Sequence, residues 1–138
     1  MNLLFDTNVV LDLLLDRRPF SRAAAGLFAA VEDGRCDGFL AATTVTTIDY
    51  LVSKALGPQA ARKAIGNLLA LMSVAAVDRK VLVAALESLV PDFEDAVIAE
   101  AAYQSGVDII VTRDSTGFGH SSATVVGPTE ALAILLEQ

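Results

Sequence analysis

The chain has 138 residues, of which 54% are hydrophobic, and its formal net charge is −7 at pH 7. This length suits one domain over residues 1–138 with a single apolar core, and the one cysteine, Cys36, excludes an internal disulfide and a zinc site of several thiolates. The acidic balance excludes a protein that grips nucleic acid over a broad basic face, because phosphate binding depends on cationic side chains. Any nucleic-acid role must therefore be local or use a metal ion.

Neither membrane insertion nor export is expected. No apolar stretch approaches the roughly 20 uninterrupted residues of a membrane span, and the first residues lack the basic start of a signal peptide. A single cysteine also fits a reducing compartment. We therefore expect a cytoplasmic protein with no membrane contact.

Short apolar runs and amphipathic segments alternate from the start of the chain. The first apolar run stops at Asp6, and the helical spacing that follows it ends before Pro19, since proline cannot continue a helix. Up to residue 72 we expect a strand over 3–5, a helix through 9–14, a helix over 21–33, a strand over 39–41, a helix capped by Thr43 that reaches residue 56, and a helix from 58 to 72.

The same alternation continues to the end of the chain. Beyond residue 72 we expect a strand over 74–77, a helix capped by Asp78 through residue 87, a helix over 92–105, strands over 109–111 and 124–126, and a last helix from Pro128. Repeated strand–helix order predicts an α/β fold. Its expected form is an open, mainly parallel sheet of four to five strands flanked by helices on both faces, in three layers.

Two aspartates follow predicted strands directly, Asp6 after the first and Asp114 after the strand over 109–111. In open α/β sheets the functional crevice lies outside the carboxyl ends of the strands, so these two acids are expected to meet there. Asp95 is the natural third member if the helix over 92–105 begins over the same edge. A Mg²⁺ or Mn²⁺ ion needs oxygen ligands, and one or two carboxylates with water normally suffice.

Helix capping explains several of these acids equally well. Asp6 can cap the first helix, and Asp92 is a good cap for the late one, whose first turn favours any acid. On a helical wheel Glu94 aligns with the centre of the apolar stripe and Asp95 lies toward its edge, so periodicity alone does not select Asp95. The only histidine, His120, lies in a stretch rich in glycine and serine and is expected to be a solvated loop residue.

Three fragments in order along the chain resemble a PIN domain: Leu4-Phe5-Asp6-Thr7-Asn8-Val9, Asp92-Phe93-Glu94-Asp95-Ala96 and Val111-Thr112-Arg113-Asp114. The segments over 17–20 and 127–130 also look typical of the family. The short single-domain form resembles the VapC-like toxin ribonucleases of type II toxin–antitoxin pairs. The resemblance implies an endoribonuclease that uses Mg²⁺ or Mn²⁺, leaves a 5′-phosphate and a 3′-hydroxyl, forms a homodimer and is inhibited by a small antitoxin protein.

Carried over by position, the resemblance assigns Asp6, Asp95 and Asp114 as catalytic metal ligands. The chain departs from the family pattern in two places. Relatives commonly carry a glutamate on the helix after the second strand, where this chain offers Thr47 at one register and Asp49 at the other. Many relatives also carry an acid before the phenylalanine that follows the third fragment, where this chain has Gly117. The fourth oxygen ligand is then expected to be Asp92 or Asp49, or to be absent.

In the implied reaction a metal-bound water attacks the phosphodiester, so no histidine base is needed. Asn8 and Thr112 are expected to orient the carboxylates. Of the basic residues nearest the proposed edge, which include Arg22, we take Arg17, Arg18 and Arg113 as candidates for RNA binding, although ordinary surface ion pairs explain them equally well.

Two other function classes compete with the nuclease. A binding module that kept the fold and lost the chemistry is consistent with the two departures from the family pattern. A phosphoacceptor of the response-regulator kind is disfavoured, because no lysine follows Lys80.

Overall fold

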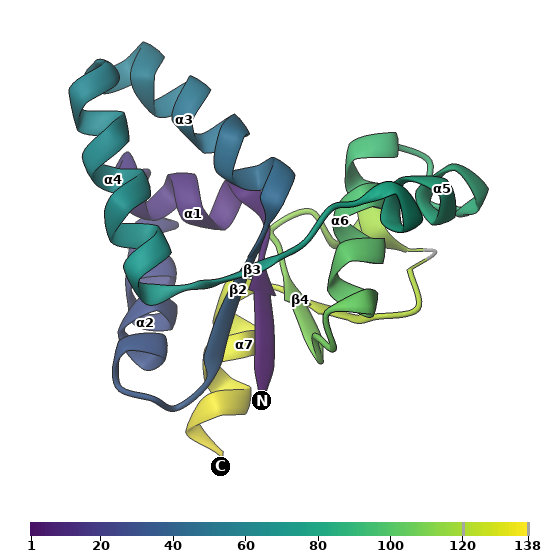
Figure 1. The fold of residues 1–138 in the computed structure, drawn as a ribbon. Coiled ribbons are helices and arrows are strands. Elements are labelled where there is room, and N and C mark those ends of the chain that lie inside the picture. Colours follow the sequence, from purple (N-terminus) through teal and green to yellow (C-terminus); the bar gives the residue numbers. More distant parts are fainter. Residues whose placement is uncertain (120, 138) are drawn as a thin grey trace.

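The computed structural model describes residues 1–119 and 121–137, and a parallel sheet runs through its centre (Figure 1). The strands are β1 (Asn2–Phe5), β2 (Asp37–Ala41), β3 (Ser73–Ala75), β4 (Ile109–Val111) and β5 (Thr124–Val126). Their order in the sheet is β3-β2-β1-β4-β5, and every neighbouring pair is parallel. The predicted α/β fold with an open parallel sheet is therefore confirmed.

The helices are α1 (Thr7–Leu14), α2 (Ser21–Glu32), α3 (Ala42–Leu56), α4 (Pro58–Leu71), α5 (Arg79–Glu87), α6 (Phe93–Gln104) and α7 (Pro128–Leu136), with a short 3₁₀ turn η1 (Ser115–Phe118). Asp78 and Asp92 cap α5 and α6 as expected, each accepting the backbone N–H of the third residue of its helix. The expected Thr43 cap is wrong: α3 begins at Ala42, and no side chain caps it.

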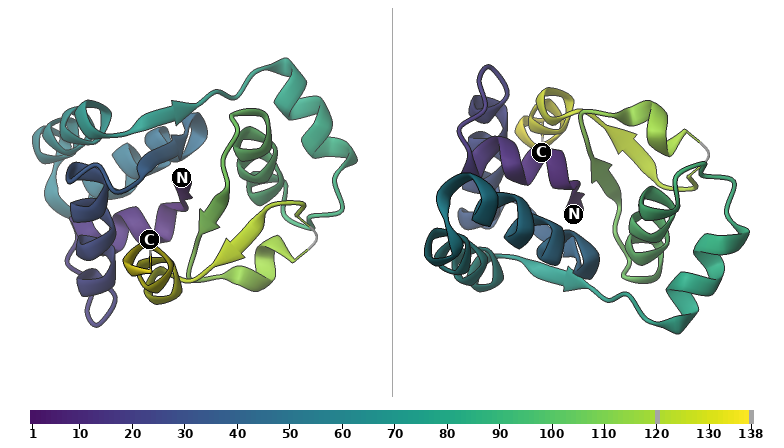
Figure 2. Two further views of the ribbon diagram at one scale, coloured as in Figure 1. Left: turned by 90° about the horizontal axis from the view of Figure 1, so that it is seen from below. Right: turned by 90° about the horizontal axis from the view of Figure 1, so that it is seen from above.

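Helices cover both faces of the sheet, because alternate side chains of a strand point to opposite faces. Leu3 and Phe5 of β1 pack into a core with α1, α2, α3, α4 and α7. Leu4 between them packs into a second core with α5 and α6. Figures 1 and 2 show this separation, with α5 and α6 on the opposite side of the sheet from α1 to α4.

The carboxyl ends of the parallel strands meet at one edge of the sheet. Phe5 of β1 is in register with Val111 of β4, so Asp6 and Thr112, the next residues of each chain segment, lie beside each other. The Asp6 N–H donates to the Val111 carbonyl at 2.9 Å, which extends the pairing by one more bond. In the part of the chain that the structure describes, no helix has the length and apolar character to cross a bilayer.

Candidate active site

Asp6 stands at the end of β1 and caps α1. One carboxylate oxygen, Oδ1, accepts the Thr7 N–H at 2.8 Å, and the other, Oδ2, accepts the Thr112 hydroxyl at 2.8 Å. The side chain is 7% exposed. Burial raises the pKa of Asp6 above its ordinary value, the hydrogen bonds from Thr112 and Thr7 lower it, and the charge of Asp114 raises it again. Asp6 can therefore cap α1 and still serve as a metal ligand, because only one of its two carboxylate oxygens caps the helix.

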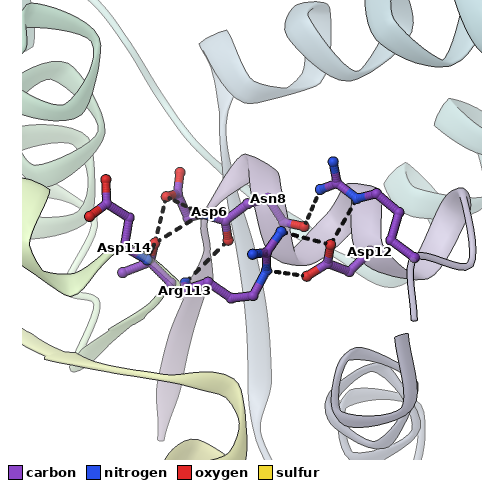
Figure 3. A network of polar contacts seen from close by, with 7 residues as sticks. Asp6, Asn8, Asp12, Arg113 and Asp114 are labelled. Atoms are coloured by element: carbon purple, nitrogen blue, oxygen red, sulfur yellow. Dashed lines mark hydrogen bonds and ion pairs between the residues drawn. The ribbon is translucent and has the colours of Figure 1, made fainter. Parts of the chain in front are cut away.

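The buried Thr112 hydroxyl joins Asp6 to the loop that carries Asp114. It donates to Asp6 and accepts the Asp114 N–H at 3.0 Å and the Asn8 side-chain amide at 3.2 Å. The Asn8 amide also donates to Asp6 at 3.4 Å. These contacts use the one donor and both acceptor positions of the hydroxyl. Asp6 and Asp114 are therefore held close together with their carboxylates on the same side (Figure 3).

Asp95 lies in the first turn of α6. Asp92 accepts its N–H at 3.0 Å, so the capping interpretation of Asp92 is correct. The pKa of Asp95 is raised to about 6, chiefly by burial and then by neighbouring negative charge. The carboxylates that add to this effect are those of Asp6, Asp92, Asp114 and Glu94. Helix α6 thus brings Asp95 to the edge where Asp6 and Asp114 lie.

Gly117 lies close to two of these acids. A Cβ built on Gly117 would lie 3.1 Å from Oδ2 of Asp95 and 3.1 Å from Oδ2 of Asp114. The two oxygens are therefore no farther apart than twice that distance. A side chain at this position would therefore contact both carboxylates.

The carboxylate oxygens of these residues are ligands of the kind that a hard divalent cation prefers. Mg²⁺ usually keeps several waters and takes only one or two protein carboxylates, at about 2.0–2.1 Å. No three acidic, histidine or cysteine side chains among residues 1–119 and 121–137 already have the spacing of a preformed metal cage. The carboxylates are close enough to repel one another, and a cation held partly through water would draw them together.

These acids line one pocket, which we call the acid pocket, with a volume of about 400 Å³. Its lining residues are Asp6, Thr7, Asn8, Leu11, Arg17, Asp92, Glu94, Asp95, Arg113 and Asp114. Of the two candidates for a fourth oxygen ligand, Asp92 lines the pocket and Asp49 does not. Thr47 does not line the pocket either, and its hydroxyl donates to the Thr43 carbonyl of its own helix at 3.1 Å.

The three candidate arginines fall into two groups. Arg17 and Arg113 line the acid pocket, and both form ion pairs with Asp12. Arg18 is 84% exposed and pairs with Asp16 at 3.5 Å. Asp12 was not among the residues predicted from the sequence, although it is the one charged residue within the apolar run over 9–15. His120 lies outside the described residues.

Residues 2–116 match the family model described as PIN domain. No curated protein matches the chain. The folds of several solved structures are similar over most of both chains. They include VapBC2 from Rickettsia felis bound to a DNA fragment from its promoter, with a TM-score of 0.70 at 13% identity over 92% of this chain and 98% of that one.

A toxin–antitoxin complex from Klebsiella pneumoniae has a TM-score of 0.67 at 22% identity over 91% and 96% of the two chains. VapC20 from Mycobacterium tuberculosis, a toxin that cleaves the sarcin–ricin loop, has a TM-score of 0.64 at 18% identity over 78% and 86%. At these identities the likeness shows a shared fold. The family model covers most of the sequence, and this chain therefore belongs to the PIN domain family.

Proposed function

We propose that the chain is a metal-dependent endoribonuclease. The observation that carries this proposal is that Asp95 and Asp114 meet beside Gly117 and that Asp6 lines the same pocket. Family membership and the likeness to solved toxin structures, one of them a sarcin–ricin loop cleaving toxin, support it. RNA is the proposed substrate, and the bond cleaved is a phosphodiester.

The residues that would hold Mg²⁺ or Mn²⁺ are Asp6, Asp95 and Asp114, with Asp92 as a further oxygen donor. Such a cation supplies polarisation of the scissile phosphate and a hydroxide-like nucleophile near neutral pH. The protein supplies orientation: Thr112 and Asn8 fix the Asp6 carboxylate, and the Thr116 hydroxyl fixes Asp114 at 2.9 Å. Asp95, with a pKa of about 6, is mostly ionised at pH 7 and available as a ligand.

Incubation of the purified protein with end-labelled RNA tests this function. We expect cleavage with Mn²⁺ or Mg²⁺ and none with EDTA, and products that carry a 5′-phosphate and a 3′-hydroxyl. Cleavage that persists in EDTA, or products with a 2′,3′-cyclic phosphate, would show a different chemistry. Ligation separates the two chemistries, because a 3′-hydroxyl accepts ligation and a 2′,3′-cyclic phosphate blocks it.

A small antitoxin protein is the proposed partner, because the similar solved structures include a toxin–antitoxin complex. We expect expression of the chain in the bacterial cytoplasm to arrest growth, and co-expression of a neighbouring small open reading frame to relieve the arrest. A homodimer is also proposed. Light scattering on the purified protein should then give twice the chain mass of 14.4 kDa.

The second candidate function is a PIN-fold binding module with little or no nuclease activity. It is favoured by the sparse acid set, since Gly117 contributes no side chain and Thr47 bonds to its own helix. Position 117 offers a direct comparison of two substitutions. Both Gly117→Asp and Gly117→Ala add the same crowded Cβ, and only the aspartate adds oxygen ligands.

We expect Gly117→Asp to bind Mn²⁺ more tightly than Gly117→Ala by about tenfold or more, the scale on which the supporting partners of a metal ligand act. If the native protein is a weakened nuclease, Gly117→Asp should also cleave RNA faster than wild type. Isothermal titration with Mn²⁺ and an RNA cleavage assay measure the two effects. Equal Mn²⁺ affinities for the two variants would mean that position 117 does not face the cation.

A further inference from the structure

Asp12 is a buried carboxylate between two arginines. It lies on α1 and is 1% exposed. Its Oδ1 accepts Nε of Arg17 at 2.8 Å and Nη2 of Arg113 at 3.1 Å, and its Oδ2 accepts Nε of Arg113 at 2.7 Å (Figure 3). Burial of an unpaired carboxylate is strongly unfavourable, so Asp12 requires such charge-assisted hydrogen bonds. Together, Asp12, Arg17 and Arg113 form what we call the arginine clamp.

The clamp joins segments that are far apart in sequence. Arg17 follows α1, and Arg113 lies 101 residues beyond Asp12, in the loop after β4 that also carries Asp114. The guanidinium of Arg113 stacks on the ring of Phe20, with its central carbon 3.9 Å from the ring centre. One face of this guanidinium is covered and its edge is held by Asp12, so its orientation is fixed.

Both arginines also donate hydrogen bonds to Asn8, which orients Asp6. Arg17 Nη2 donates to the Asn8 carbonyl at 3.0 Å, and the Arg113 N–H donates to the Asn8 side-chain oxygen at 3.3 Å. The Asn8 amide in turn donates to Asp6. A short path of hydrogen bonds therefore runs from Asp12 to the candidate metal ligand.

The clamp places positive charge on the wall of the acid pocket. Two guanidinium groups and one carboxylate leave one net positive charge, and both arginines line the pocket. Their side chains are 38% and 29% exposed for Arg17 and Arg113. A guanidinium has five N–H groups, and the hydrogen bonds to Asp12 and Asn8 use only some of them on each arginine. Each arginine therefore keeps further donors at the wall of the acid pocket.

We propose that Asp12 is a positioning residue: it holds Arg17 and Arg113 as a fixed pair that binds a phosphate of the RNA backbone beside the scissile one. Arg18, exposed and paired with Asp16, takes no part in this subsite. The inference rests on the proposed function for its substrate. The role inferred for Asp12 is therefore neither metal binding nor packing in the core.

The substitution Asp12→Asn tests the proposal by the sign of its effect. It removes one negative charge, which would tighten RNA binding if the arginines acted only through net charge. Loss of positioning has the opposite effect. We expect the Kd for a short fluorescein-labelled single-stranded RNA in EDTA, and KM with Mn²⁺, to rise about tenfold, the scale of a lost hydrogen bond to a charged group. The expected change in kcat is small.

The matched control is Asp16→Asn, which makes the same charge change in an exposed ion pair and should leave Kd and KM unchanged. A second readout is the salt dependence of RNA binding: its slope should become shallower in Asp12→Asn by about 0.7 for each phosphate that the arginines no longer neutralise. RNA binding that is unchanged or tighter in folded Asp12→Asn would overturn the proposal.

Arg17→Lys and Arg113→Lys decide the matter if Asp12→Asn does not fold. Each keeps the charge and loses guanidinium hydrogen bonds to the buried Asp12 carboxylate. Each should therefore weaken RNA binding and lower the melting temperature, while the protein still folds. Lysine variants that fold and bind RNA as wild type does would overturn the proposal. If wild-type protein binds RNA without cleaving it, the nuclease function is refuted, but the binding comparison of the variants still tests the role of Asp12. If wild-type protein does not bind RNA, the proposed role of Asp12 is overturned.

Discussion

Asp6→Asn is expected to abolish metal-dependent RNA cleavage while the fold is retained. Asparagine keeps the shape of the side chain and is about as good a helix cap as aspartate, so it can still accept the Thr7 N–H. It removes the charge that a divalent cation needs. Supporting partners of metal ligands are worth about 10–100-fold, and a ligand itself should exceed that loss. Initial cleavage rates with Mn²⁺ measure the effect.

Asp78→Asn is the matched control for Asp6→Asn. Asp78 caps α5 by accepting the Val81 N–H at 3.0 Å, as Asp6 caps α1, but it does not line the acid pocket. Both variants should still fold without metal, because each keeps its helix cap. Asp78→Asn should cleave RNA normally. Equal activity of the two variants would mean that Asp6 is only a cap.

Stability without metal should fall as the pH rises from about 4 to about 6, as a result of Asp95. The folded-state pKa of Asp95 is raised to about 6 from 3.8, so between these values the folded protein binds more protons than the unfolded one. Unfolding free energy then decreases with rising pH. The raised pKa of Asp6 acts in the same direction. Melting temperatures measured in EDTA across this range show the effect.

Asp95→Asn isolates the contribution of Asp95, because the other titrating groups remain. The melting temperature of wild type minus that of the variant should decrease from pH 4 to pH 6 and stay level above pH 6. Above pH 6, where the ionised carboxylates can bind Mn²⁺, added Mn²⁺ should raise the melting temperature of wild type above that of the variant. A difference that grows with pH in EDTA would contradict a raised pKa for Asp95.

The sequence predicted the sheet well where strands are buried on both faces. Residues 109–111 form β4 as expected, because three consecutive apolar residues have no solvated side. The edge strand β3 was predicted over 74–77 and lies over Ser73–Ala75, since Ser73 and Val74 are exposed and mark no boundary in the apolar pattern. The Thr43 cap failed because the chain enters α3 directly from β2.

The acid pocket could be predicted only in part. The carboxyl ends of parallel strands meet at one edge of a sheet, and this rule was sufficient to predict that Asp6 and Asp114 lie at the same edge. Asp95 needed the family resemblance, because Asp92 caps the same helix and accounts for an acidic first turn. Asp12 could not be selected, since its partner Arg113 is brought to it by tertiary folding across 101 residues.

Calorimetric titration of Mn²⁺ into wild type and into the double variant Asp6→Asn, Asp95→Asn tests the central claim, that these aspartates hold the cation. For wild type we predict saturable binding and a melting temperature that rises with Mn²⁺. The double variant should fold and show neither effect. Equal Mn²⁺ binding by the two proteins would contradict the account.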